Sequence, residues 1–432
     1  MIKADRLSSW IFIGTFILLV PSVKLLKFTD ELTALLLMGV AVFDCIVNGN
    51  WKKYKCLWSI CAIMAFYALY SLTMMNNNTP YAIAVDALIQ LKPFVPFFVI
   101  MALGIHFTPS DKLILKIFAV VNCVIVAFIT LFFRESVDDI IQHVSYIGII
   151  AFVSALVYLY CSIDNDGNLD KGHLLTGLCM MSIGLLGTRA KFYATFILAV
   201  FFLIFYRPGI SRQSLIKLTA VAGFVMLCII AVAWKKFEYY FITGNSGRFD
   251  PEVMEAFARP ILYATGFLIL IHYFPFGSGL ASFASYASGE ISYSGIYSEY
   301  GINHVYGLSK QYPAFICDAF YPSLAQFGIA GVCLFIYFWI YIAKKLKSLV
   351  RINPERNRLY FALGWIIIFF ILIESVASTI FVQSGGQCAM MILGAICSTV
   401  KIHSRIETKK NDKPIYSFSY LNTQEICQNP IQ

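Results

Sequence analysis

Arginines in the polar stretches of this apolar chain are the first candidates for chemistry. Arg189 lies between two apolar runs, and Arg248 and Arg259 lie in the longest polar interval. A planar guanidinium group can bind a phosphate through two parallel hydrogen bonds, so we expect these arginines to hold a phosphate or pyrophosphate. Simpler explanations also exist. Arg189 can reach lipid headgroups, and the other two can form surface ion pairs, Arg259 with Glu255 one helical turn earlier.

Two side chains in the same interval are candidates for proton transfer. The imidazole of His304 has an ordinary pKa of about 6.5, which suits a general base for a hydroxyl nucleophile, although a single loop histidine is also common on protein surfaces. Asp318 can act as a base, orient a basic group, or cap the helix expected from Pro322 onward. The spacing of His, Cys, Asp and Glu does not fit a zinc site, so we expect no metal and no cofactor.

The interval also contains a short glycine motif and many tyrosines. Gly277 and Gly279 permit a tight turn and close approach of the backbone to a ligand. Aromatic rings stack on the apolar faces of sugars while their hydroxyls form hydrogen bonds, so Tyr300 and Tyr306 are candidates for holding a glycan. Tyrosine is equally at home at a membrane interface, which gives the same residues a second explanation.

Membrane-spanning helices must position these residues. Apolar residues make up 59% of the 432 residues and charged residues only 13%, against about 25% charged in soluble proteins. Apolar runs of about 20 residues, long enough to cross a bilayer as helices, recur along the chain. We therefore expect an all-α, polytopic integral membrane protein. Most of the 12 cysteines lie in or beside these runs and are expected to be buried thiols instead of disulfides.

The pattern predicts about twelve spans and one large outer loop late in the chain. Residues 1–234 hold nine spans, 235–321 form the loop, 322–402 hold three spans and 403–432 form a tail. Lys and Arg concentrate in the segments that then lie inside, which places both termini in the cytoplasm and explains the net charge of +9 without nucleic acid. Within the loop, residues 261–274 are apolar but too short to span, and predict a helix at the surface or docked on the bundle. The predicted spans are 10–26, 31–48, 56–75, 81–107, 113–133, 144–163, 174–187, 190–206, 218–234, 322–343, 359–382 and 388–400.

The order of these features resembles the O-antigen polymerase and ligase superfamily, the Wzy/WaaL type of lipid-linked glycan transferase. The matching pieces are Gly187-Thr-Arg-Ala190 between two spans, a large outer loop, and Arg259 followed by Phe276-Gly-Ser-Gly279. The loop then ends in Asp318-Ala-Phe-Tyr-Pro-Ser323. The resemblance in overall plan covers nearly the whole chain, and each motif is short.

This resemblance implies a transfer reaction on the periplasmic face of a bacterial inner membrane. An undecaprenyl-pyrophosphate-linked glycan would be the donor, a sugar hydroxyl the nucleophile and pyrophosphate the leaving group. Arg189 and Arg259 would hold the pyrophosphate, and His304 or Asp318 would be the base. Many members have a histidine near the place of Asp318, and the aspartate favours a polymerase over a ligase that joins polymer to lipid A-core. Membrane lipids and a chain-length regulator protein are the other implied partners.

A flippase or secondary transporter is the alternative from another class. Asp86, Lys92 and Glu374 lie inside predicted spans, where charges need partners or water and can form an ion path. A structural pair of Asp86 with Lys92, or a cavity lining, explains them equally well. Pro93 and Pro96 predict a kink in the same span. The long loop and the lack of a visible internal repeat favour the glycosyltransferase.

Overall fold

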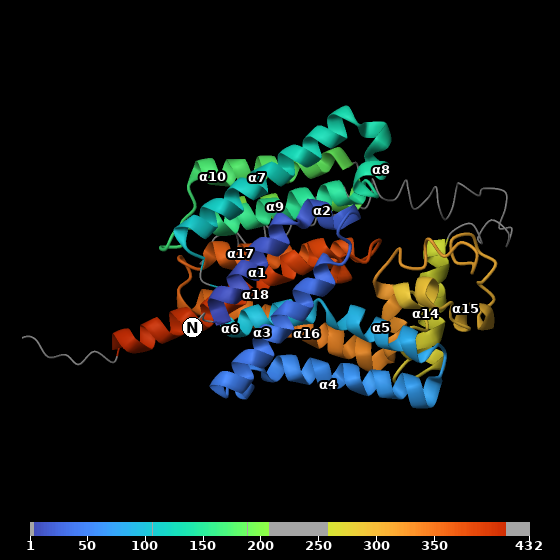
Figure 1. Cartoon of the computed structure of the whole chain (residues 1–432). Helices are drawn as coiled ribbons and strands as arrows, with labels where there is room; N and C mark the ends of the chain where they lie inside the picture. Colours follow the sequence, from blue (N-terminus) through green and yellow to red (C-terminus); the bar gives the residue numbers. More distant parts are fainter. Residues whose placement is uncertain (1–3, 106, 188, 207–257, 412–432) are drawn as a thin grey trace, which may run out of the picture.

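The computed structural model describes residues 4–105, 107–187, 189–206 and 258–411, and all regular elements in these ranges are helical (Figure 1). The expected all-α class is confirmed for this part of the chain. The first half contains α1 (Ala4–Ile17), α2 (Leu19–Lys24), α3 (Thr29–Asn48), α4 (Lys55–Tyr70), α5 (Pro80–Leu91), α6 (Phe94–Leu103), α7 (Pro109–Phe132), α8 (Val137–Ile141), α9 (Ser145–Ser162), α10 (Lys171–Ile183) and α11 (Ala190–Phe205). The second half contains α14 (Ala258–His272), α15 (Ile296–Glu299), α16 (Gly328–Ile352), α17 (Arg358–Glu374) and α18 (Ser384–Asn411).

Short helices continue or join several of these elements. A turn of π-helix, η2 (Ser71–Met75), extends α4, and the 3₁₀ helix η4 (Gly184–Gly187) follows α10. The 3₁₀ helices η7 (Tyr321–Phe327) and η8 (Ile380–Val382) precede α16 and α18. The predicted kink is confirmed as a break between α5 and α6 at Lys92 and Pro93.

Several of these helices fit a membrane. Five in the described ranges are long and apolar enough to cross one: Trp51–Met75, Pro80–Leu103, Pro109–Phe132, Ser145–Ser162 and Tyr321–Ile352. The structure thus supports a helical membrane protein but not the count of twelve spans. Other predicted spans fall short for a physical reason: α10 has 13 residues and α17 has 17, whereas about 20 are needed at a rise of about 1.5 Å per residue. The predicted span 218–234 lies outside the described residues.

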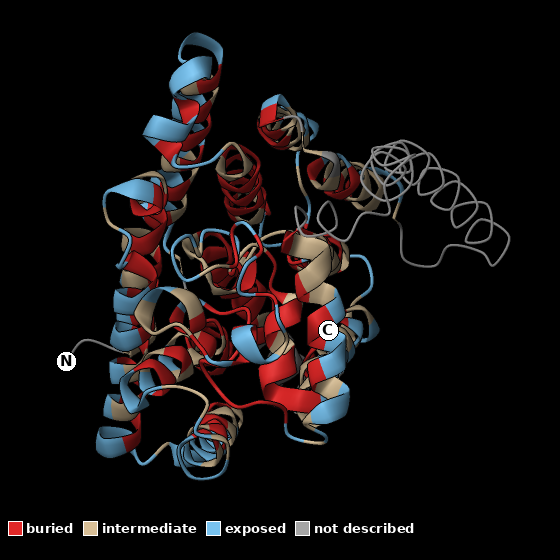
Figure 2. Ribbon diagram, turned by 90° about the vertical axis from the view of Figure 1, so that its right-hand side faces the viewer, coloured by how far each residue is buried: buried red, intermediate tan, exposed pale blue. Residues whose placement is uncertain are grey.

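The outer faces of the bundle are apolar. Figure 2 shows buried residues gathered in the middle of the molecule and exposed residues on the surfaces of the peripheral helices. On α7 these exposed residues include Leu113, Ile117, Val124, Phe128 and Phe132. An exposed apolar face that runs along a whole helix suits contact with lipid tails.

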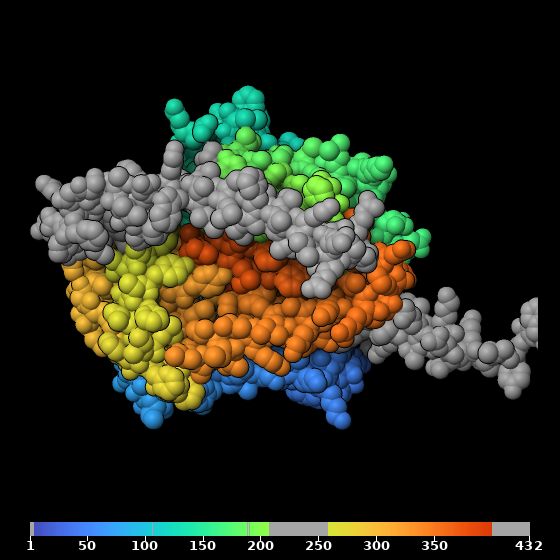
Figure 3. Space-filling view, turned by 180° about the vertical axis from the view of Figure 1, so that it is seen from behind, coloured from blue at the N-terminus to red at the C-terminus, as the bar shows by residue number. Residues whose placement is uncertain are grey.

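Residues 258–327, here called the loop segment, pack against the α4–α5 hairpin at one end of the bundle (Figure 1). The predicted short helix is α14, which buries Leu262 and Ile269 within the segment's own apolar core and also contacts η7 and α16. Seen from behind in Figure 3, α14 in yellow lies against α16 in orange. Because the segment has its own core, it is an ordered body and holds its side chains in fixed places.

Hydrogen bonds with the α4–α5 hairpin fix the backbone of the loop segment. The hydroxyl of Tyr67 donates to the carbonyl of Phe327 at 2.8 Å, and Nδ2 of Asn78 donates to the carbonyl of Ala281 at 2.6 Å. In the other direction, the N–H of Ala281 donates to the carboxylate of Asp86 at 2.7 Å, and Gln90 also contacts Asp86. Asp86 therefore binds loop backbone and does not pair with Lys92, so one of the alternatives drawn from the sequence is wrong.

The glycine motif is part of this interface. Gly277 and Gly279 have positive φ angles of 81° and 85°, which glycine adopts at no steric cost. A Cβ at Gly277 would lie 2.3 Å from the amide nitrogen of Gly328 and 2.4 Å from the carbonyl oxygen of Ala325, and one at Gly279 would lie 2.9 Å from Oγ of Ser71. The structure thus accounts for both glycines through close packing inside the protein. Their role in substrate binding stays a prediction.

Gly277→Ala is expected to lower the free energy of unfolding by at least about 2 kcal/mol, because a positive φ costs about 1–2 kcal/mol and the added Cβ meets two backbone atoms. Thermal unfolding of the detergent-purified protein measures the loss. Gly295→Ala is the matched control: Gly295 has φ −64°, and a Cβ there meets no atom within 4 Å. Equal stability of the two variants would contradict the packing role of Gly277.

Candidate functional site

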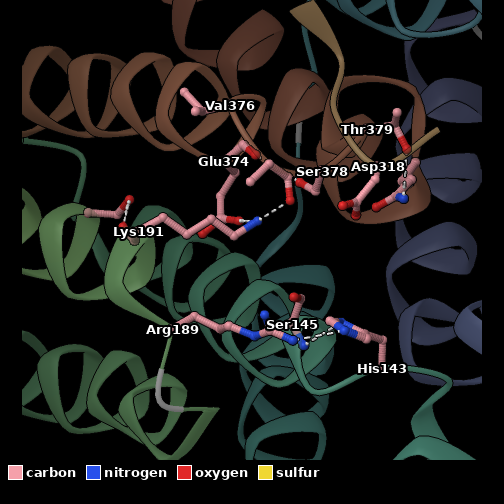
Figure 4. A network of polar contacts seen from close by, with 12 residues as sticks. His143, Ser145, Arg189, Lys191, Asp318, Glu374, Val376, Ser378 and Thr379 are labelled. Carbon is pink, nitrogen blue, oxygen red and sulfur yellow. Dashed lines mark hydrogen bonds and ion pairs between the residues drawn. The ribbon is translucent and has the colours of Figure 1, made fainter. Parts of the chain in front are cut away.

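A cluster of charged side chains lies at the end of the bundle where the loop segment sits (Figure 4). We call it the charged cluster; it consists of Arg189, Lys191, Arg259, Asp318 and Glu374 together with His143. These residues come from five separate parts of the chain. They carry three positive and two negative charges when His143 is neutral, which suits an anionic ligand.

Arg189 occupies the position just before α11 and pairs with a histidine. Its Nη2 donates to Nε2 of His143 at 2.8 Å, and His143 lies in the connection between α8 and α9. Because an arginine can only donate, Nε2 of His143 must be unprotonated in this contact. The imidazole is therefore held neutral, with one nitrogen accepting a charge-assisted hydrogen bond.

Arg259, near the start of α14, forms an ion pair with Asp318. Asp318 does not cap the following helix, since the residue before η7 is Phe320. The two side chains are 42% and 33% exposed, so solvent screens the pair and it contributes only about 0–1 kcal/mol to folding. The Nε of Arg259 is buried and has no hydrogen-bond partner among the described residues. The side chain as a whole is 42% exposed, so the outer N–H groups of this guanidinium can reach a further acceptor.

Lys191 and Glu374 form the buried pair of the cluster. The Nζ of Lys191 lies 2.6 Å from Oε2 of Glu374, and the two side chains are 15% and 3% exposed. The same ammonium group donates to the carbonyl of Ala377 at 3.0 Å. A charge this deep is stable only with its partner in place. The pair therefore fixes the start of α11, and with it Arg189, against the end of α17.

The turn after α17, residues 375–379, is where the pieces of the cluster meet. The carbonyl of Ser375 accepts from the N–H of Phe320 at 3.1 Å, and the carbonyl of Val376 accepts from the hydroxyl of Tyr263 at 2.7 Å. The first contact positions the chain that carries Asp318, and the second positions the first turns of α14. Lys191 binds the carbonyl of Ala377 in the same turn. Three segments that are far apart in the sequence, those of Lys191, Tyr263 and Phe320, are therefore joined to one turn.

The electrostatics of His143 reflect these neighbours. Partial burial of the ring lowers the pKa of His143 from its ordinary 6.5, and the positive charges of Arg189 and Lys191 lower it further, against smaller opposing effects of Asp138 and Asp318. The ring thus remains neutral to a lower pH than a free histidine. Because its Nε2 lone pair accepts from Arg189, His143 holds that guanidinium in place.

The structure brings together three of the predicted site residues, Arg189, Arg259 and Asp318. The others lie apart from the described contacts of the cluster. His304 is exposed on the loop segment, the hydroxyl of Tyr300 contacts Nδ1 of His272 at 2.9 Å, and Tyr306 packs its ring 4.8 Å from that of Tyr312. Arg248 lies outside the described residues. A base role for His304 and glycan binding by the tyrosines stay predictions.

Sequence reasoning did not assign His143 and Lys191 to the site, and it grouped Glu374 with Asp86 and Lys92 as intramembrane charges of a possible ion path. One signal was available: Lys191 follows Arg189 by two residues in the same short motif. His143 offered none, because its connection to Arg189 depends on how α9 and α11 pack. Within the described ranges, no group of three or more His, Cys, Asp and Glu is arranged to hold a metal ion.

No protein-family model matches the chain, and no curated protein sequence matches it either.

Protonation of His143 should break its contact with Arg189. The unfolded chain binds this proton near pH 6.5, whereas folded His143 stays neutral to lower pH. The ring's contribution to stability is therefore complete above pH 6.5 and is lost as the pH falls through the lowered pKa. Histidine-selective ¹³C NMR should give a titration midpoint below 6.5, with His143→Gln assigning the signal.

Removing the charge of Arg189 tests whether that charge lowers the pKa of His143. Arg189→Ala should move the His143 midpoint upward, toward 6.5. Arg134→Ala is the matched control, because Arg134 is an exposed arginine in the preceding connection and does not contribute to the shift. A wild-type midpoint above 6.5, or equal effects of the two variants, would contradict the assignment.

Breaking the Lys191–Glu374 pair should cost far more stability than breaking Arg259–Asp318. Glu374→Ala leaves a buried ammonium group unpaired, which costs about 3–5 kcal/mol, whereas Arg259→Ala should cost at most about 1 kcal/mol. Chemical or thermal unfolding in detergent measures both. The double variant Lys191→Met/Glu374→Leu should recover most of the loss, because it leaves no unpaired buried charge. A double variant less stable than Glu374→Ala would contradict this explanation of the loss.

Proposed function

We propose that this protein is a periplasmic-face polymerase of O-antigen or a related surface polysaccharide in a bacterial inner membrane. It would transfer glycan from an undecaprenyl-pyrophosphate donor to a sugar hydroxyl. The observation that supports this most is the convergence of Arg189 and Arg259, each with donor atoms suited to phosphate, beside an acidic and a neutral imidazole group. This is the arrangement needed where a pyrophosphate leaves and a hydroxyl loses its proton.

In the proposed reaction a sugar hydroxyl attacks the anomeric carbon of the donor. The new carbon–oxygen bond forms as the bond from that carbon to the pyrophosphate oxygen breaks, and the electron pair leaves with the pyrophosphate. Arg189 and Arg259 would stabilise the charge that develops on the leaving group. The hydroxyl proton passes to a base, and Asp318 is the predicted candidate that lies within the cluster. No other group is consumed, so the atoms and charges balance.

The buried charges that suggested a transporter have separate partners. Asp86 binds the backbone of Ala281, Lys92 pairs with Asp30 and Glu31, and Glu374 pairs with Lys191. A proton or ion path needs groups that hand the ion from one to the next. Each of these charges is instead explained by a local contact, which favours the glycosyltransferase over the transporter.

Arg189→Ala and Arg259→Ala are each expected to reduce polymer at least about 100-fold at unchanged protein level, since removing one donor to a developing charge costs about 10²–10³ in rate. Arg→Lys at either position should restore little, because a point charge cannot replace the two-pronged guanidinium. Polymer banding on gels and immunoblots of the membranes are the measurements. Arg134→Ala serves as the control, and wild-type banding in both cluster variants would refute the role of these arginines.

Deletion of the gene separates polymerase from ligase. A lipopolysaccharide core that carries a single repeat unit indicates a polymerase. A bare core, with lipid-linked polymer still accumulating, indicates the ligase that transfers finished polymer to lipid A-core. An unchanged ladder and capsule would contradict both.

A further inference from the structure

A groove lies on the surface of the bundle between α16, α17 and the end of α11, and we call it the basic groove. Its walls come from the second half of α16, the first half of α17, and Tyr206, which directly follows α11. Its volume of about 490 Å³ lies within the range of roughly 300–1,000 Å³ that is typical of sites for small organic ligands.

The basic groove lies at the end of the bundle opposite to the charged cluster. The loop segment ends in η7, which leads directly into α16 at Gly328, so α16 begins at the loop end. At a rise of about 1.5 Å per residue, Lys344 lies about 24 Å and Arg351 about 35 Å along the helix from Gly328. The hydrocarbon core of a bilayer is about 30 Å thick. These two side chains therefore lie where α16 leaves the hydrocarbon and reaches the lipid headgroups.

Three basic side chains line one wall of the groove. Lys344, Lys347 and Arg351 are spaced by three and four residues, so they share one face of α16, and all three are exposed. None of them belongs to an ion pair among the described residues, and no described acidic residue lines the groove. This wall therefore carries three uncompensated positive charges and attracts an anion.

The general excess of basic residues on the inner side of a membrane explains part of this pattern. It accounts for Lys and Arg at this end of the bundle. It does not require three of them to share one helix face beside a groove. Lys345 shows the contrast, because its ammonium group lies 5.7 Å from the centre of the Tyr341 ring and it does not line the groove.

Aromatic and aliphatic side chains form the rest of the lining. The ring of Phe361 stacks on that of Tyr206 at 5.0 Å between centroids, and it lies 6.3 Å from the ring of Trp365. Tyrosine and tryptophan favour the membrane interface, where one side of the ring meets lipid chains and the polar atom meets headgroups. Ile340 and Ala343 extend the lining toward the middle of α16. The groove is thus basic at one end and apolar at the other.

This polarity matches an anionic phospholipid. A lipid phosphate accepts charge-assisted hydrogen bonds from ammonium and guanidinium groups, and the first carbons of its acyl chains can pack on the apolar lining. A free phosphate would leave that lining uncovered. A lipid without net charge would leave the three positive charges uncompensated. Basic pockets between helices at the inner side of a membrane bind anionic headgroups for the same reasons.

We propose that the basic groove binds one anionic phospholipid of the membrane leaflet at this end of the bundle, the cytoplasmic leaflet in the predicted topology. The phosphate lies among Lys344, Lys347 and Arg351, and the upper part of an acyl chain lies along Ile340 and Trp365. The bound lipid joins α16 to α17. The inference does not depend on the proposed function, because the groove and the charged cluster are at opposite ends of the molecule.

Native mass spectrometry of the full-length protein in detergent tests the proposal, because it counts bound lipids and gives the Kd of the first one. The probes are dioleoylphosphatidylglycerol, which carries one net negative charge, and dioleoylphosphatidylcholine, which has the same chains and no net charge. The variant Lys344→Gln/Lys347→Gln/Arg351→Gln removes the three charges. Since all three side chains are exposed, it is expected to fold.

Two further variants separate the groove from its surroundings. Lys52→Gln/Lys55→Gln/Lys171→Gln is the matched control: it removes three exposed basic side chains from the beginnings of α4 and α10, outside the groove. Ala343→Phe fills the groove with a ring and leaves every charge in place. Thermal unfolding without added lipid shows whether each variant is as stable as the wild type.

The wild type is expected to bind the first phosphatidylglycerol at least about tenfold more tightly than phosphatidylcholine, because each basic residue near the membrane surface adds attraction for an anionic lipid. The glutamine variant of the groove should lose this preference, and the matched control should keep it. Ala343→Phe should also lose it, at unchanged charge. Inorganic phosphate at the same concentration should not displace phosphatidylglycerol, since it has no chain to cover the apolar lining.

Four results would overturn the proposal. Equal affinity of the wild type for the two lipids, or an unchanged preference in the glutamine variant, would show that the groove does not select an anionic lipid. An equal loss in the matched control would show a diffuse attraction to the whole basic end. Displacement by inorganic phosphate would show a phosphate site instead of a lipid site. If Ala343→Phe is less stable without lipid and keeps the full preference, another segment of the chain fills the groove.

Discussion

The carbonyl groups at the end of α17 are what the arrangement of the charged cluster depends on. The last carbonyls of any helix have no intrahelical partner and need donors from elsewhere. In this protein the carbonyl of Leu372 in the last turn of α17 accepts from Tyr321. The carbonyls of Ser375, Val376 and Ala377, in the turn that follows, accept from Phe320, Tyr263 and Lys191. The need to satisfy one helix end thus assembles α11, α14 and η7 around a single turn.

Two kinds of ion pair follow from this arrangement, and they have different consequences. Lys191 and Glu374 are buried, so each depends on the other and the pair holds the scaffold together. Arg259 and Asp318 are partly exposed, so their attraction is screened and easily exchanged. A phosphate oxygen can replace the carboxylate of Asp318 as the partner of Arg259 at little net cost. Under the proposed function, that exchange would free Asp318 to act as the base.

The sequence predicts the helical class and most helix positions well, because long apolar runs determine both. The predicted number of twelve spans is not confirmed: within the described ranges five helices are long and apolar enough to cross a membrane, and α10, with 13 residues, is not among them. The described contacts of the site could be predicted only in part. Arg189 and Arg259 stand out by residue type and order, whereas the pairing of Lys92 with Asp30 joins positions 62 residues apart.

Such long-range pairs depend on how helices pack, and no local pattern encodes them. His143 is the clearest case, because nothing in its immediate sequence distinguishes it from an ordinary residue at the end of a span. Gly277 and Gly279 illustrate a second limit of a local pattern: the sequence suggests close approach to a ligand, and the structure adds close approach to the protein itself, to backbone atoms at Gly277 and to the side chain of Ser71 at Gly279.

The attachment of the loop segment to α4 and α5 has a consequence for access. Asn78 binds the carbonyls of both Ala281 and Ser292, and Ser71 and Asp86 accept from the next two backbone N–H groups, of Leu280 and Ala281. A segment held at this many points is not a hinged cover. A membrane-anchored ligand would then enter laterally from the bilayer, between helices, and would bind to a preformed surface. Little of its binding free energy would be spent on ordering the protein.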